Sequence, residues 1–130
     1  MIKEEAIVIR KLITKYLRQA KSVLDIGSST LEYRTVKQPY IDEIIFKPMR
    51  QEGTTIHYLD IINGEGIDIV ADISSKSFNL PKEYDLVICG NTLHLCSDIK
   101  TSIRNISSTV HRDGYLIITA PLVFPYHDGP

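Results

Sequence analysis

The sequence predicts a single α/β domain in which helices flank a doubly wound, mainly parallel sheet of about five strands. Short runs of β-forming residues alternate along the chain with segments whose apolar residues recur at helical spacing. Several runs are continuously apolar, as is typical of strands buried on both faces of a parallel sheet. A chain of 130 residues, 43% of them hydrophobic, has the size of one domain, so we expect one domain over residues 1–130.

The first expected element is an amphipathic helix over residues 2–20. Its apolar residues recur every three to four positions, which places them on one helix face. The first 21 residues also carry more basic than acidic side chains, the acidic ones being Glu4 and Glu5. We interpret these charges as a solvated face and expect the other face to pack on the sheet. The apolar residues are Ile2, Ala6, Ile9, Ile13, Tyr16 and Leu17.

Five β-rich runs follow the helix, each bounded by turn residues. Their order, with longer connections between most of them, favours parallel pairing. We expect strands at residues 22–26, 55–59, 67–71, 84–89 and 115–119.

The connections between the runs carry the other predicted helices. Residues 31–50 join the first two runs, and Pro39 and Pro48 predict that this connection is irregular rather than one regular helix. Residues 74–82 and 97–110 occupy the helix positions before and after the fourth run, and the second segment keeps its apolar residues at helical spacing.

One join departs from this scheme, because only about six residues, 61–66, link the second and third runs. A parallel crossover usually needs a dozen or more residues. Either the third run pairs only briefly, or the crossover is a loop without a helix.

Composition argues against several classes of protein. Fifteen Lys and Arg against sixteen Asp and Glu give a net charge of -1, so the overall charge favours neither nucleic acid nor a membrane as partner. Cys89 and Cys96 lack further cysteine or histidine pairs at ligand spacing, which predicts no metal site and no disulfide framework. No apolar segment approaches the ~20 residues that span a bilayer, and the N-terminus does not resemble a signal peptide. We therefore expect a reduced, cytoplasmic protein.

The ends of the strands are where a ligand is expected, because open parallel sheets bind ligands beyond the carboxyl ends of their strands. The first run ends in DIGSS, residues 25–29, where Gly27 lets the backbone turn and approach a ligand closely. The second ends in Asp60, which could accept hydrogen bonds from both ribose hydroxyls or could simply be solvated. The third ends in Asp72 and the fourth in CGNT, residues 89–92. Together these residues indicate a nucleoside-sized site.

Five blocks, in order along the chain, resemble class I S-adenosylmethionine-dependent methyltransferases, which have a Rossmann-like core. The blocks span nearly the whole chain, and YDLVICGNTL is quite specific. A later PYH, residues 125–127, resembles more weakly a subgroup often found among cell-surface glycan genes. The blocks are VLDIGSS (23–29), HYLDI (57–61), IVADI (69–73), YDLVICGNTLHLCSD (84–98) and RDGYLIITAP (112–121).

The resemblance implies S-adenosylmethionine as cofactor and a set of binding residues. In that family the first motif lies at the methionine end of the cofactor, the second strand end at the ribose and the third at the adenine, while the fourth closes the pocket under the methionine. At the matching positions of this chain, the resemblance implies Asp25, Gly27 and Ser28 at the methionine end, Asp60 at the ribose, Asp72 and Ile73 at the adenine, and Gly90 and Asn91 under the methionine. Ser29, Ile61 and Thr92 adjoin these residues.

The implied activity is methyl transfer from S-adenosylmethionine to a small-molecule or sugar-like acceptor. Such transfer mainly needs alignment of the acceptor, with removal of a proton where the acceptor is a hydroxyl. His94 and His127 could act as a base because imidazole titrates near neutrality, although a structural role is the alternative for each. His57, within a strand pattern, is expected to be structural or half exposed, and His111 is expected to face solvent; no catalytic residue is assigned.

Three departures from the family pattern support a second hypothesis. Ser28, Ser29 and Thr30 stand where the family carries further glycines, and Leu-His-Leu, residues 93–95, stands where it commonly has Leu-Glu-His. The chain also stops at Pro130, where the family adds a helix and a two-strand hairpin. The alternative is thus a truncated, inactive domain that binds the nucleoside cofactor or a protein partner. In either case the fifth strand becomes an open edge, which predicts a homodimer or a covering tail.

Overall fold

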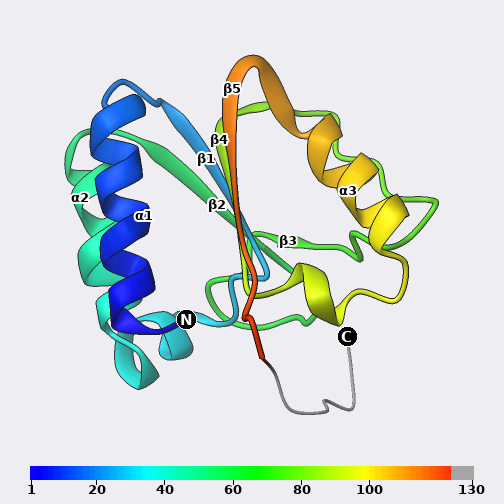
Figure 1. Ribbon diagram of the computed structural model, residues 1–130, viewed down its shortest axis with the longest axis horizontal. Helices are drawn as coiled ribbons and strands as arrows, with labels where there is room; N and C mark the ends of the chain where they lie inside the picture. The colour runs from blue at the N-terminus through cyan, green and yellow to red at the C-terminus, as the bar shows by residue number, and fades with distance from the viewer. Residues whose placement is uncertain (124–130) are drawn as a thin grey trace.

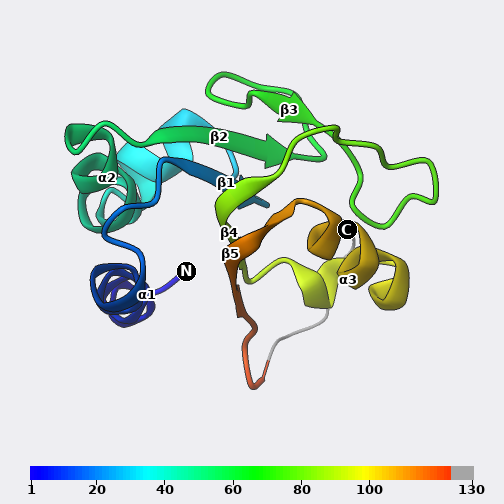
Figure 2. The same cartoon turned by 90° about the horizontal axis from the view of Figure 1, so that it is seen from above.

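The computed structural model describes residues 1–123 and contains a five-stranded, all-parallel sheet. The strand order is β3-β2-β1-β4-β5, so the direction of winding reverses between β1 and β4 (Figure 2). The predicted fold class, a doubly wound parallel α/β sheet, is confirmed. The strands are β1 Ser22–Ile26, β2 Thr55–Asp60, β3 Ile69–Val70, β4 Tyr84–Gly90 and β5 Val110–Thr119.

The register brings the carboxyl ends of the central strands to one edge of the sheet. Ile26 in β1 lies opposite Leu59 in β2 and Cys89 in β4. The residues that follow these three strands therefore lie next to one another, although they are far apart in sequence. This is the edge at which the switch in strand order predicts a ligand.

The helices cover both faces of the sheet. α1 Lys3–Tyr16 and α2 Lys47–Gln51 lie on one face and α3 Ile99–Ser108 on the other (Figure 1). The irregular connection expected between β1 and β2 is confirmed, because two π-helical segments, η1 Tyr33–Lys37 and η2 Asp42–Phe46, precede α2.

Two apolar clusters form the core, one on each face. Alternate residues of β4 serve them in turn: Leu86 and Ile88 face α1 and α2, whereas Val87 and Cys89 face α3. This alternation explains why the central strands read as continuously apolar in the sequence. The first cluster contains Ala6, Ile9, Ile13, Leu17, Val23, Ile41, Ile45, Phe46, Met49, Leu86 and Ile88, and the second Leu24, Ile26, Leu59, Ile73, Tyr84, Val87, Cys89 and Ile106.

The segment before β4 contradicts the sequence analysis, because residues 74–82 form no helix. Ser74 donates to Asp72 from both its backbone nitrogen and its hydroxyl, and Ser77 donates its backbone N–H to Ser75 Oγ. Such local bonds compete with helical ones, and Pro81 adds a further break. The β2–β3 link fits both expected alternatives, since β3 has two residues and residues 61–68 contain no helix.

The other boundaries differ by a few residues. The first helix ends at Tyr16 rather than residue 20, and the fifth strand starts at Val110 rather than at 115, so α3 stops at Ser108. A register shift in the β4–β5 pairing accompanies the longer strand. Gly114 permits it, because a Cβ there would lie 2.9 Å from the carbonyl oxygens of both Tyr84 and Asp85.

β5 forms an edge of the sheet, and no other segment of residues 1–123 pairs with its outer side. Tyr115 and Ile118 are 47% and 39% exposed on it. Tyr16 of α1 stacks on the Tyr115 ring, with ring centroids 6.2 Å apart. The open edge expected from the sequence is present in this part of the chain, whereas its cover by a second copy stays a prediction.

Candidate functional site

A pocket of about 250 Å³ lies at the carboxyl ends of β1, β2 and β4. Its apolar wall comes from the cluster on the α3 face, and its polar groups come from the strand ends. The sequence-predicted residues that line it are Gly27, Asp60, Ile61, Asp72, Ile73, Asn91 and Thr92, joined by Ile26, Leu59, Ile62, Ala71, Ser74, Leu95 and Cys96. Of the predicted residues, Asp25, Ser28, Ser29 and Gly90 lie beside the pocket without lining it, and their contact with a cofactor stays a prediction.

The turn after β1 needs glycine at one position. Gly27 has φ +73°, and a Cβ built on it would lie 1.9 Å from Thr92 Oγ1. The Gly27 and Ser28 backbone N–H groups both donate to the Leu59 carbonyl, at 2.8 and 3.2 Å. The turn after β1 is therefore packed between the end of β2 and the loop after β4.

Asp60 connects the pocket to this turn. Its Oδ2 accepts a hydrogen bond from the Ser29 backbone nitrogen at 2.8 Å, and its Oδ1 accepts a longer one from Ile62 N at 3.3 Å. Each carboxylate oxygen can accept a second hydrogen bond. Asp60 is thus held in a fixed orientation and retains acceptor capacity for a ligand hydroxyl.

The wall after β3 is also fixed by hydrogen bonds. Asp72 Oδ1 accepts from Ser74 N and Ser74 Oγ at 2.9 and 2.6 Å. Asn105 of α3 donates its side-chain N–H groups to the carbonyls of Ile73 and Ser75, both at 2.8 Å. α3 therefore positions this wall through one amide side chain.

Asp25 lies on the α1 face of the sheet and is 7% exposed. Within residues 1–123 its carboxyl group makes no hydrogen bond, and burial raises its pKa to about 7. The Arg34 guanidinium opposes this rise in pKa, while the nearby Asp60 adds to it. A buried carboxyl group with a shifted pKa beside a ligand pocket is typical of functional sites.

Arg34, which the sequence analysis did not single out, is completely buried beside the site. Its Nη1 donates to the Ser29 carbonyl at 2.6 Å and its Nη2 to the Gly66 carbonyl at 3.0 Å. The guanidinium carbon lies 3.7 Å from the centroid of the Tyr58 ring, within cation–π range. No motif marks this residue, because both partners are backbone carbonyls, and one of them, Gly66, lies 32 residues further along the chain.

A second missed residue, Glu5, lies where β4 and β5 end. Both Glu5 carboxylate oxygens accept from Asn91 Nδ2 at 2.9 Å, and Oε1 also accepts from Thr119 Oγ1 at 2.5 Å. The N-terminal end of α1 and the end of β5 lie at the same edge of the molecule (Figure 1). A Cβ on Gly90 would lie 3.1 Å from Met1 Cε, so the N-terminal segment approaches the backbone here. Glu5 therefore belongs to the site region rather than to a solvated helix face.

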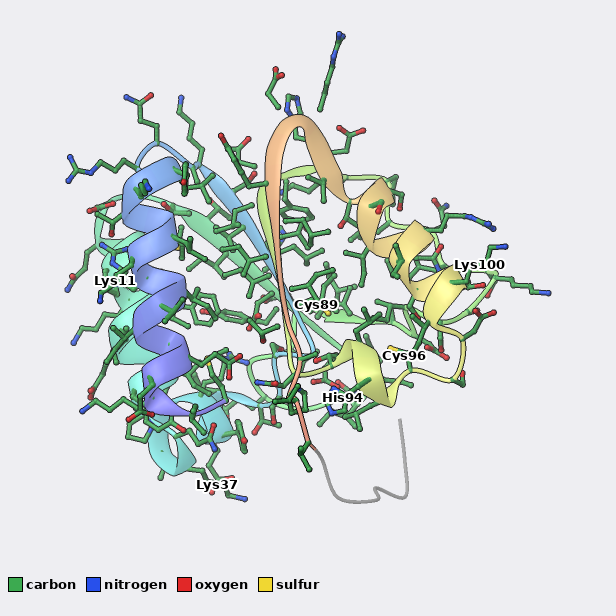
Figure 3. All side chains as sticks on the ribbon, in the orientation of Figure 1. Lys11, Lys37, Cys89, His94, Cys96 and Lys100 are labelled. Atoms are coloured by element: carbon green, nitrogen blue, oxygen red, sulfur yellow. The ribbon has the colours of Figure 1, made fainter. Side chains whose placement is uncertain are left out.

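The two cysteines and His94 lie on the α3 side of this region (Figure 3). Burial raises the pKa of the Cys89 thiol to about 12 and also raises that of Cys96, so neither is an activated nucleophile. His94 lies in the one-turn helix η3 Leu93–Leu95, directly after the pocket residues of the β4 loop, but does not line the pocket. Both cysteines are free thiols.

The remaining histidines have the environments that were expected, as far as the structure describes them. His57 Nδ1 lies 2.8 Å from the hydroxyl of the buried Tyr84, and His111 is exposed. His127, with the PYH motif, lies outside the described residues. Within residues 1–123, no group of three or more His, Cys, Asp or Glu side chains could hold a metal ion. The helices in this part of the chain lack the length and the apolar composition of a membrane span. The cytoplasmic location stays a prediction.

Several solved structures that share this fold are methyltransferases. The N-methyltransferase NodS of Bradyrhizobium japonicum, in complex with S-adenosylhomocysteine, has a TM-score of 0.63 at 14% identity, covering 89% of this chain and 60% of NodS. The O-methyltransferase of a trans-AT polyketide synthase multienzyme of Brevibacillus brevis, with the same ligand, has a TM-score of 0.60 at 15% identity, covering 90% of this chain and 40% of that one. Coclaurine N-methyltransferase has a TM-score of 0.59 at 16% identity, covering 86% and 35%. The methyltransferase fold implied by the sequence resemblance is confirmed.

Curated proteins match over shorter segments, and no protein-family model matches the chain. A highly reducing polyketide synthase of Gibberella fujikuroi is 36% identical over 59 residues, which are 45% of this chain and 2% of the synthase. Fumosorinone synthetase of Cordyceps fumosorosea is 33% identical over 52 residues, which are 40% of this chain and 1% of the synthetase. This chain thus spans a very small share of these relatives and about three fifths of NodS.

Proposed function

We propose that the chain binds S-adenosylmethionine at the carboxyl edge of its sheet and transfers the methyl group to a small-molecule acceptor. The observation that carries the proposal is the pocket at the switch in strand order, which combines the Asp60 carboxylate with apolar walls. The neighbours crystallised with S-adenosylhomocysteine support it through the shared fold. Their acceptors differ, so the acceptor of this chain is proposed only as a class.

The residues present fit the nucleoside part of this cofactor. Asp60 is oriented by Ser29 N and has lone pairs left for ribose hydroxyls. Ile61, Ile73 and Leu95 supply apolar surface suited to a planar base. The pocket volume of about 250 Å³ is slightly below the roughly 300–1,000 Å³ of drug-sized ligand sites, which suits a nucleoside better than a whole cofactor. The methionine part would then extend past Gly27 toward Asp25 and Asn91.

The chain would contribute mainly orientation to the reaction. When bound, the cofactor would supply an activated methyl group on a sulfonium, so the protein needs no covalent intermediate. Asp60 would fix the ribose, and Gly27 would let the backbone lie close to the ligand. Holding the two reactants in line can remove roughly 7–11 kcal/mol of the barrier to such a transfer.

A second candidate function is cofactor binding without turnover. The observation in its favour is that, within residues 1–123, none of the histidines lines the pocket, so no neutral base faces it from this part of the chain. Formation of S-adenosylhomocysteine over a panel of amine and hydroxyl acceptors would support transfer. Tight binding without product over the whole panel would support the binding domain.

Calorimetry with S-adenosylmethionine and S-adenosylhomocysteine tests the proposed binding. Asp60→Asn should weaken both ligands by about tenfold or more, because hydrogen bonds to a charged acceptor contribute roughly 1.5–3 kcal/mol each. Asp68→Asn is a matched control, since Asp68 lies at the far end of the loop that follows Asp60 and accepts from Tyr58 N, outside this pocket.

The two possible failures have different meanings. No measurable heat with either ligand on the wild-type chain would overturn the proposed cofactor. Binding that is unchanged in Asp60→Asn would overturn only the assignment of Asp60 to the ribose.

A further inference from the structure

The Glu5 carboxylate occupies an unusual position for a charge on a surface helix. It is half-buried, and three hydrogen bonds from Asn91 and Thr119 fix both of its oxygens. All of these donors are neutral. Within residues 1–123, the side-chain ion pair that the structure contains joins Arg50 to Asp42, far from Glu5 in the sequence. The negative charge of Glu5 is therefore held by neutral donors rather than by a basic side chain in this part of the chain.

Glu5 is one side chain away from the pocket. Asn91 lines the pocket and at the same time donates its side-chain amide to Glu5. Asn91 has φ +52°, and its backbone nitrogen donates to the Thr119 carbonyl at 3.0 Å. The Asn91 amide is thus held between β4 and β5. The Glu5 carboxylate lies behind it, on the β5 side of the pocket, whereas Asp72 lies on the β3 side.

A second carboxyl group, Asp25, lies on the same side; it is about half ionised near pH 7, because burial raises its pKa to about 7, and a nearby cation would favour its ionised form. Asp25 is 7% exposed on the α1 face, from which Glu5 also projects, and makes no hydrogen bond within residues 1–123. Arg34 is the basic side chain that acts on it, and both Arg34 Nη atoms are already bonded to carbonyls. A ligand that brings a positive charge to this side would be favoured over a neutral one of the same shape.

S-adenosylmethionine and S-adenosylhomocysteine differ in this respect. The first has a sulfonium cation, whereas the second has a neutral thioether at the same place, and the other groups are shared. We propose that Glu5 makes the site prefer S-adenosylmethionine over S-adenosylhomocysteine, so that the product leaves more easily than the cofactor. This inference rests on the proposed function and assigns Glu5 as a specificity-determining residue, without a part in bond making.

The expected effect can be bounded from electrostatics. For an assumed separation of roughly 7 Å between the Glu5 carboxylate and the sulfonium, in a medium between protein and water, Coulomb's law gives a change in affinity of about tenfold. Glu5→Gln has the same shape and keeps an acceptor for Thr119 but removes the charge. It should weaken S-adenosylmethionine about tenfold more than S-adenosylhomocysteine, measured by calorimetry with both ligands.

Two further variants separate charge from structure. Glu4→Gln removes the same charge one residue away on the exposed side of α1 and should leave the ratio of the two dissociation constants unchanged. Glu5→Asp keeps the charge and should keep most of the preference. The ratio is insensitive to a general loss of folded protein, because both ligands are measured on the same sample.

Each outcome decides one point. A wild-type chain that binds neither ligand would overturn the proposed function and this inference with it. A wild-type chain that binds both, with a Glu5→Gln variant whose ratio is unchanged, would overturn this inference and leave the proposed function standing. A ratio that also shifts in Glu4→Gln would assign the effect to overall charge and would likewise overturn the role of Glu5.

Discussion

Gly27→Ala should destabilise the protein by about 2–5 kcal/mol, because the backbone conformation at position 27 disfavours an L-residue and the new methyl group meets Thr92. At φ +73° an L-residue costs about 1–2 kcal/mol more than glycine. The added Cβ would lie 1.9 Å from Thr92 Oγ1 and 2.8 Å from both Cβ and Cγ2 of that residue. Such an overlap costs about 1–3 kcal/mol more. Equilibrium urea unfolding followed by circular dichroism measures the change in the free energy of unfolding.

A double-mutant cycle with Thr92→Gly isolates the steric part. The glycine at position 92 removes all three atoms that the methyl group would meet. The double variant should therefore carry only the backbone cost of an L-residue at position 27 and the loss of the Thr92 side chain itself. We expect Gly27→Ala and Thr92→Gly to be less harmful together than the sum of the two, by about 1–3 kcal/mol. A coupling below about 0.5 kcal/mol, or a single Gly27→Ala variant as stable as wild type, would refute the close approach of the two loops.

Three other predictions concern stability and association. The Asp25 pKa of about 7 in the folded state exceeds the unfolded value of 3.8, so the contribution of this group to stability is present below about pH 4 and is lost as the pH rises to 7. Asp25→Asn should remove about 3–4 kcal/mol of this pH dependence, measured by urea unfolding at a series of pH values. The same dependence of the free energy of unfolding on pH in both proteins would argue against the buried acid. Asn105→Ala should lose about 1–3 kcal/mol in thermal or urea unfolding, because the carbonyls of Ile73 and Ser75 lose their donor, whereas Asn79→Ala on the exposed loop should change little. The β5 edge predicts self-association that rises with concentration and is abolished by Ile118→Lys; sedimentation that shows a monomer throughout would contradict it.

The fold could be predicted because its signal is local. Continuous apolar runs such as that of β4 follow from burial on both faces, and the strand ends follow from the run ends. The missing helix at 74–82 could not be predicted from periodicity, since it depends on serine and aspartate side chains that bond to the nearby backbone. The longer β5 depends on the close packing of Gly114 against β4, which the sequence does not display.

The candidate site was predictable at the strand ends and elsewhere was not. Asp60 and Asp72 follow directly from where strands stop, and both line the pocket. Arg34 and Glu5 come from helical segments, and each has a partner far away in the chain: Gly66, 32 residues from Arg34, and Asn91, 86 residues from Glu5. Such contacts arise from the tertiary structure. From the sequence alone, a charged residue in a helix is therefore expected to be solvated.

The buried guanidinium of Arg34 has a consequence for motion. It holds the carbonyls of Ser29 and Gly66, and Leu31 N donates to the Glu65 carbonyl at 2.9 Å beside it. The turn after β1 and the loop after β2 are thereby joined through a side chain that has no access to water. The two segments should open together as one cooperative unit, so their amide protons would exchange with solvent at a common free energy of opening rather than loop by loop.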